Sequence, residues 1–209
     1  MDTAWFKELL EHSFYLLALL NPVSKVMFLA SCGENASPRQ NFELSWKSSL
    51  AALLILFTVA VAGQFILSRI FHVELFALQI TGGLVVFAIG WNAIQSGRFT
   101  NAAAANLKVS LTDLSIVPLA APLIAGPGMI AAVIASAVAR GFPLTIGSTI
   151  VALGINFIFM VYARKINAGL GRLHLLGPVI RLTGLIIAAI SVQMVLVGLR
   201  DAVATYFLN

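Results

Sequence analysis

The chain has 209 residues, of which 60% are hydrophobic and only 10% are charged. Soluble domains carry about 25% charged residues, so this composition excludes a soluble protein and indicates transmembrane helices throughout. The formal net charge is +5, but the basic residues follow or precede apolar runs, where they set membrane topology. The expected surroundings are therefore a lipid bilayer, and no nucleic-acid partner is expected.

Six apolar stretches are long enough to cross a bilayer, for which a helix needs about 20 residues. They are residues 13–30, 49–68, 75–94, 114–139, 144–163 and 182–199. The polar stretches 32–47, 95–112 and 165–178 are expected to be loops. The sequence thus predicts an all-α membrane protein with six transmembrane helices in one domain that covers residues 1–209.

The basic residues divide unequally between the two sides of this arrangement. The side shared by both termini holds Lys7, Arg69, Arg140 and Arg200. The opposite side holds Arg39, Lys47, Arg98, Lys108, Arg164, Lys165, Arg172 and Arg181. Cytoplasmic loops are enriched in Lys and Arg, so the second side is predicted to be cytoplasmic and both termini external.

The two halves of the chain resemble each other weakly. With an offset of 101 residues, Gly83 falls on Gly184 and Gly90 on Ser191; with an offset of 105, Asn21-Pro22 falls on Gly126-Pro127. A unit of three helices reverses its direction when it repeats, so residues 9–97 and 113–203 are predicted to be two inverted repeats. Inverted repeats are typical of secondary transporters, although apolar helices can also match by chance.

Small residues recur every seven positions in the third and sixth helices. They are Gly83, Gly90 and Gly97 in the third, and Gly177, Gly184, Ser191 and Gly198 around the sixth. Seven residues make nearly two turns, so each set lies on one helix face. Glycine lets helix backbones approach closely in lipid, and tight helix packing is the expected role.

The first and fourth helices are interrupted by Asn21-Pro22 and by Gly126-Pro127-Gly128, the latter after Pro118 and Pro122. Proline breaks a continuing helix but suits the first position of a new one, with Asn before it as a cap. Each break is predicted to end one half-helix at midmembrane and begin another, at about Val23 and Gly128. Two kinks without a ligand are the alternative.

The start of a half-helix presents unpaired N–H groups and the positive end of the helix dipole, which bind carboxylates. Carbonyls released by the break can bind a cation. The residues predicted to bind a substrate are Asn21, Pro22, Ser24, Thr81, Gly82, Gly126, Pro127, Gly128, Thr183 and Gly184.

Two charged residues adjoin these helices. Lys25 follows the first break, and Asp113 begins the fourth helix, where a carboxylate is favoured by the helix dipole. An ionisable residue inside a membrane helix is a functional candidate, so both are candidates for coupling or charge compensation. The alternative for Lys25 is that its long side chain extends to the cytoplasmic headgroups.

The chain lacks the common catalytic motifs, and its three histidines, His12, His72 and His174, are scattered. The expectation is a protein that is not an enzyme and has neither a metal site nor a cofactor.

The chain resembles the MarC family of bacterial inner-membrane proteins. The resemblance rests on residues 19–22 (LLNP), 81–84 (TGGL), 117–128 (VPLAAPLIAGPG) and 184–194 (GLIIAAISVQM). It implies six spans with external termini in the inner membrane. It also implies transport of small neutral amino acids of the alanine, glycine and serine class, coupled to Na⁺ or H⁺.

One family motif departs from its usual form. The family's first break usually reads Asn-Pro-x-Gly-Asn-x-Pro, whereas here Ser24, Lys25 and Met27 replace its Gly, Asn and second Pro. The substrate or the coupling ion is therefore expected to differ from those of typical members.

The function predicted is secondary transport by alternating access, with a small-molecule substrate bound between the two breaks. Two alternatives are a small-solute channel and a structural or partner-binding membrane protein that transports nothing. Assembly into a homo-oligomer is left open.

Overall fold

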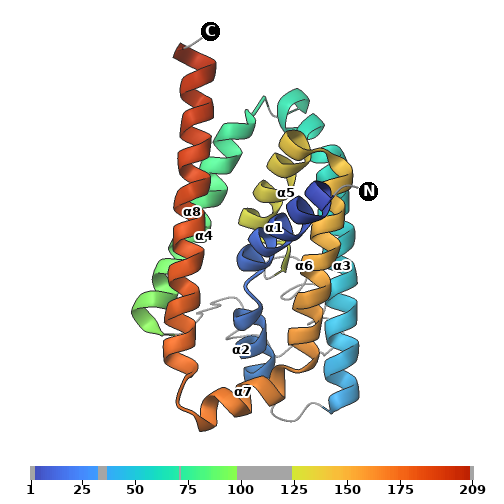
Figure 1. The fold of residues 1–209 in the computed structure, drawn as a ribbon, viewed down its shortest axis with the longest axis vertical. Helices are drawn as coiled ribbons and strands as arrows, with labels where there is room; N and C mark the ends of the chain where they lie inside the picture. The colour runs from blue at the N-terminus through green and yellow to red at the C-terminus, as the bar shows by residue number, and fades with distance from the viewer. Residues whose placement is uncertain (1–2, 33–36, 71, 98–123, 208–209) are drawn as a thin grey trace.

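The computed structural model describes residues 3–32, 37–70, 72–97 and 124–207. These residues form helices and short connections and contain no strand, which confirms the all-helical class (Figure 1). In chain order the helices are α1 (Thr3–Leu20), α2 (Pro22–Cys32), α3 (Pro38–Phe65), the π-helical turn η1 (Ile66–Ile70), α4 (Leu75–Ser96), α5 (Pro127–Arg140), α6 (Phe142–Val161), α7 (Ala163–Arg172) and α8 (Leu176–Phe207).

Five helical segments of the described residues are long and apolar enough to cross a membrane, so the protein is an integral, multi-pass membrane protein. They are Thr3–Leu29, Pro38–Gly63, Leu75–Ser96, Phe142–Val161 and Leu176–Phe207. The predicted fourth span, residues 114–139, begins outside the described residues. Its visible part is α5, whose 14 residues extend about 21 Å, less than the roughly 30 Å of a bilayer core.

Two predicted loops are partly wrong. Residues 38–47 already belong to α3, because Ser37 and Gln40 form a capping box in which each side chain pairs with the other's backbone amide. Residues 165–172 belong to α7, whose charged residues Arg164 and Lys165 are exposed while Ala163 is buried. Helix α8 also begins six residues before the predicted 182. Polarity alone suggested loops, but polar residues also begin helices and cover their exposed faces.

Helices α4 and α8 run antiparallel along their length, as the green and red helices of Figure 1 show. A Cβ added to Gly90 would lie 2.8 Å from Gly184 O, one added to Gly83 2.9 Å from Ser191 O, and one added to Gly198 2.9 Å from Phe76 O. The two backbones therefore touch at Gly83, Gly90, Gly184, Ser191 and Gly198, which confirms tight packing there, whereas a Cβ on Gly177 would have nothing within 4 Å. At the end of α4, Gly97 adopts φ 62°, a left-handed conformation that suits glycine.

Helices α1, α3, α5 and α6 make the other part of the bundle. Their buried side chains, including Leu16, Leu56, Met129 and Leu153, form one hydrophobic cluster. Asn41, in the first turn of α3, donates from Nδ2 to the carbonyl oxygens of Met160 and Val161, both at 3.1 Å. This contact attaches the start of α3 to the end of α6.

Both chain termini lie toward the same end of the bundle, the upper end in Figure 1, together with η1 and the end of α5. The start of α3 and all of α7 lie at the opposite end. The segments that hold Arg39, Arg164, Lys165 and Arg172 therefore lie at one end of the bundle, and η1, which holds Arg69, lies at the other. The assignment of the α7 end to the cytoplasm stays a prediction.

Candidate functional site

The first break lies at Asn21, between α1 and α2. Its backbone has φ 52°, a left-handed conformation that asparagine adopts more readily than most residues. The Asn21 amide closes the last turn of α1 by donating to Leu17 O at 3.0 Å. Its side-chain Oδ1 accepts from the Ser24 amide at 3.3 Å, and Pro22 is the first residue of α2. The predicted cap and helix start are therefore confirmed at this break.

Lys25 lies against the same break and is only 3% exposed. Its ammonium donates to Leu20 O, a carbonyl near the end of α1 that the break releases from helical hydrogen bonding. Ser24, also buried, donates from Oγ to Asn21 O at 2.8 Å. The lysine side chain thus folds back onto the break and does not extend to the headgroups. One released carbonyl already has a cation as its partner.

The second break has its described part at Gly126. This residue is extended, with φ −70° and ψ 168°, and precedes Pro127, the first residue of α5. The Ile130 amide donates to Gly126 O at 2.9 Å, which closes the first turn. Gly128 and Met129 lie in the first turn of α5, whose amides have no partner within the same helix. Asp113, Pro118 and Pro122 lie outside the described residues, so their predicted roles stay predictions.

Helix α4 crosses α5 at this second break. A Cβ on Gly82 would lie 2.6 Å from Ala131 Cβ and 3.6 Å from Pro127 O. A Cβ on Gly128 would lie 1.9 Å from Val86 Cγ2. Gly82 and Gly128, predicted as site residues from separate segments, therefore allow one close helix crossing.

The two breaks border one hydrophobic core. Leu20 and Val26 flank the first break, Ala125 and Met129 flank the second, and all four belong to the same buried cluster. Both helix starts are thus held by the same packed side chains.

The other predicted site residues lie elsewhere. Thr81 is exposed on α4. Thr183 donates to Val179 O within its own helix at 2.5 Å. Gly184 contacts Gly90 and Ala93, two turns along α4 from Gly82. The structure therefore associates Gly82 with the second break and places Gly184 in the contact between α4 and α8, whereas Thr183 bonds within α8.

A cavity of about 380 Å³ lies between α1, α4, α5 and α8. Its polar lining among the described residues comprises Glu11, His12, Tyr15, Gln79, Ser136, Arg140 and Gln193. Ala132 and Met194 also line it; Ala132 is one turn after Gly128, and Met194 Cε would lie 3.6 Å from a Cβ on Gly82. The cavity therefore extends along α5 from Arg140 to Ala132, one turn short of the crossing at the second break.

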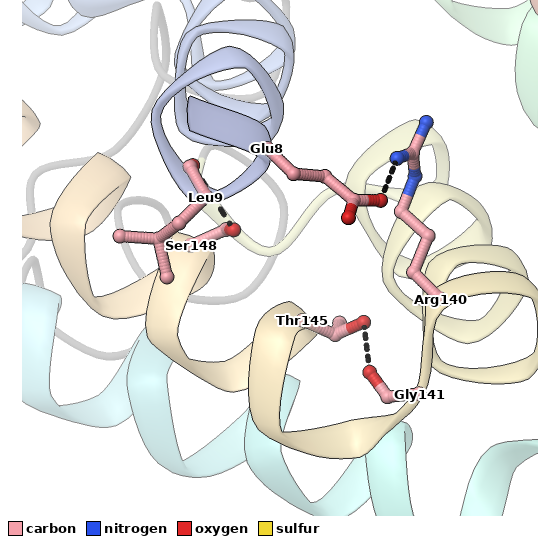
Figure 2. Close-up of polar contacts among 6 residues, drawn as sticks. All are labelled: Glu8, Leu9, Arg140, Gly141, Thr145 and Ser148. Carbon is pink, nitrogen blue, oxygen red and sulfur yellow. Dashed lines mark hydrogen bonds and ion pairs between the residues drawn. The ribbon is translucent and has the colours of Figure 1, made fainter. Parts of the chain in front are cut away.

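Polar contacts attach α1 to α5 and α6, as Figure 2 shows. Arg140, at the end of α5, donates from a terminal nitrogen to Glu8 Oε1 of α1 at 2.7 Å. Ser148 of α6 donates from Oγ to Leu9 O of α1 at 3.3 Å. The start of α1 is thus attached to both α5 and α6.

Comparison with known proteins identifies the family. A sequence model described as "MarC family integral membrane protein" matches residues 6–203. The chain belongs to the MarC family. The predicted resemblance is confirmed over nearly the whole sequence.

Individual MarC relatives align over most of their length. A UPF0056 membrane protein of Pyrococcus horikoshii is 33% identical, over 92% of this chain and 93% of the relative. The UPF0056 inner membrane protein MarC of Salmonella arizonae is 30% identical, over 91% of this chain and 93% of the relative. The protein YvbG of Bacillus subtilis is 28% identical, over 88% and 90%. No solved structure matches the chain.

Reasoning from the sequence missed the polar lining of the cavity in this MarC-family chain. The three histidines are scattered in the sequence, and no motif marks Gln79 or Gln193 as residues of a site. A usable signal was present in the first helix, where Glu8, His12 and Tyr15 recur at spacings of four and three residues. That spacing places these three side chains on one face of the first helix.

Proposed function

We propose that this protein is a secondary transporter of small neutral amino acids that works by alternating access in the inner membrane. One observation carries the proposal: two helices, α2 and α5, begin at Pro22 and Pro127 inside apolar segments, and a polar cavity extends along α5 as far as Ala132, five residues after the second of these starts. Irregular backbone among apolar helices is tolerated where it lines a cavity, and helix starts there can take a carboxylate.

The antiparallel contact between α4 and α8 is compatible with the inverted repeat that alternating access needs. The 101-residue offset carries Gly83 onto Gly184 and Gly90 onto Ser191. Under this offset Gly83 corresponds to Gly184 and Ser191 corresponds to Gly90. The Gly83–Ser191 contact therefore corresponds to the Gly90–Gly184 contact, and both contacts are present. Two antiparallel helices related in this way have the packing expected across a pseudo-two-fold axis. The proposal is that each of the two repeats contributes one of these helices and one break.

In the proposed cycle, one repeat rocks against the other while the substrate carboxylate meets the amides at the start of a half-helix. The close crossing of Gly82 and Gly128 would open and close during this motion. Six spans with external termini complete the proposed arrangement, and Na⁺ or H⁺ is the proposed coupling ion.

The experiment is uptake of radiolabelled alanine, glycine and serine into proteoliposomes that contain the purified protein. Saturable uptake driven by a Na⁺ or H⁺ gradient is expected. Non-saturable flux would instead indicate a channel. A purified, folded protein that neither binds nor transports any of the three would contradict the proposal.

A further inference from the structure

The cavity contains two buried polar atoms that have no hydrogen-bond partner in the described part of the protein. They are Nε2 of His12, a residue only 4% exposed, and Oε1 of Gln79. Both residues line the cavity, one from α1 and the other from α4. A buried polar atom without a partner is costly, and native proteins usually satisfy such groups. These two therefore indicate that the cavity receives a polar guest.

The mouth of the cavity supplies a cation. Arg140 uses one guanidinium nitrogen for Glu8, and both side chains of this pair are about half exposed. A guanidinium has five N–H donors, so Arg140 has capacity to bind a second carboxylate at the same time. The cavity thus offers a carboxylate-binding group at the end of α5 and an acceptor, Gln79 Oε1, on α4.

Part of the cavity wall, on α5 and α8, is apolar. Ala132, Ala135 and Ala139, which are spaced along one face of α5, line the cavity together with Val197. These side chains are short and apolar and offer nothing to a charged or extended side chain of a guest. A small, uncharged side chain suits this wall.

We propose that this cavity is the outer binding site for a small zwitterionic α-amino acid, which occupies it before reaching the second break. The carboxylate binds Arg140, the ammonium donates to Gln79 Oε1, and His12 Nε2 takes part in the same hydrogen-bond network. Gln79 presents its oxygen by rotation about its broad terminal torsion. The inference rests on the proposed transport function and adds to it the location and chemistry of first recognition.

The first test uses purified protein and thermal unfolding with L-alanine as the probe. Ethylamine lacks the carboxylate and propionate lacks the ammonium. L-alanine should raise the melting temperature, and each analogue should bind roughly tenfold or more weakly, as expected for loss of a charge-assisted hydrogen bond. Equal stabilisation by either analogue would overturn the proposed two-ended recognition.

The second test uses Gln79→Leu and Arg140→Gln, with Asn92→Leu and Arg200→Gln as matched controls. Asn92 is exposed on α4, and Arg200 lies near the same end as Arg140 but pairs with Asp201. The two cavity variants should bind L-alanine roughly tenfold or more weakly, and the controls should bind it like the parent. Gln79→Leu should also melt no lower than the parent without ligand, because it removes an unsatisfied acceptor.

The melting temperature of ligand-free Gln79→Leu separates a role in ligand binding from a role in structural stability. A structural role for Gln79 would lower the melting temperature of the ligand-free variant, and that result would overturn the proposed role of Gln79. If the parent binds L-alanine and both cavity variants bind it equally well, the outer site is wrong while the transport proposal stands. If the folded parent binds none of alanine, glycine and serine, both proposals are wrong.

Discussion

Replacing Gly90 by alanine tests whether the contact between α4 and α8 depends on backbone approach. The added Cβ would lie 2.8 Å from Ala188 N and 2.8 Å from Gly184 O, whereas an ordinary Cβ contact begins at 3.4 Å. Both neighbours are backbone atoms, which no side-chain rotation can move away. The two helices must therefore separate locally by several tenths of an ångström. Gly177→Ala on α8 is the matched control, because its Cβ would have nothing within 4 Å.

The magnitude follows from two opposing effects. Overpacking a well-packed contact costs about 1–3 kcal/mol, and alanine improves helix propensity over glycine by about 1 kcal/mol. The control gains the second effect without the first. Gly90→Ala should therefore be about 1–3 kcal/mol less stable than Gly177→Ala. In a protein of this size that difference corresponds to a melting temperature lower by about 2–12 °C.

The assay is thermal unfolding of the purified variants in one detergent, followed by tryptophan fluorescence or circular dichroism. Size-exclusion chromatography before heating confirms that each variant starts folded. Equal melting temperatures for Gly90→Ala and Gly177→Ala would refute the argument that these backbones are in direct contact.

Three further predictions concern the breaks and the topology. Gly128→Leu should abolish L-alanine binding without preventing membrane insertion, because a side chain there meets Val86 at the crossing of α4 and α5. The control, Gly154→Leu at an open position of α6, should bind L-alanine normally. Unchanged binding by Gly128→Leu would mean that the second break is only a kink. Lys25→Asn should make L-alanine binding more dependent on sodium than in the parent, because in the parent the lysine side chain already donates to Leu20 O at the break. Equal sodium dependence in both proteins would refute the idea that Lys25 takes the place of a sodium ion. A reporter that works only outside the cytoplasm should be active when fused to the C-terminus, as the distribution of Lys and Arg predicts. Activity only of a reporter that works inside the cytoplasm would contradict both the orientation and the six-span arrangement.

Several features of the fold were predictable because they depend on residues close together in the chain. Long apolar stretches specify membrane helices, and five such segments are present in the described residues. Asn21-Pro22 and Gly126-Pro127 carry the conformational preferences of a helix start, and α2 and α5 begin where those preferences predict. The recurrence of small residues at every seventh position likewise indicated the faces on which α4 and α8 meet.

The placement of side chains from different helices was decided only by the tertiary structure. Lys25 had two options from the sequence, and the contact with Leu20 O depends on how the chain turns at Asn21. The cavity depends on four helices, with His12 and Gln193 contributed from opposite ends of the sequence. Local periodicity states which face of a helix is polar, but it does not state which other helix that face meets. That information depends on the packing of the whole bundle, and it is why the breaks were predictable whereas the cavity was not.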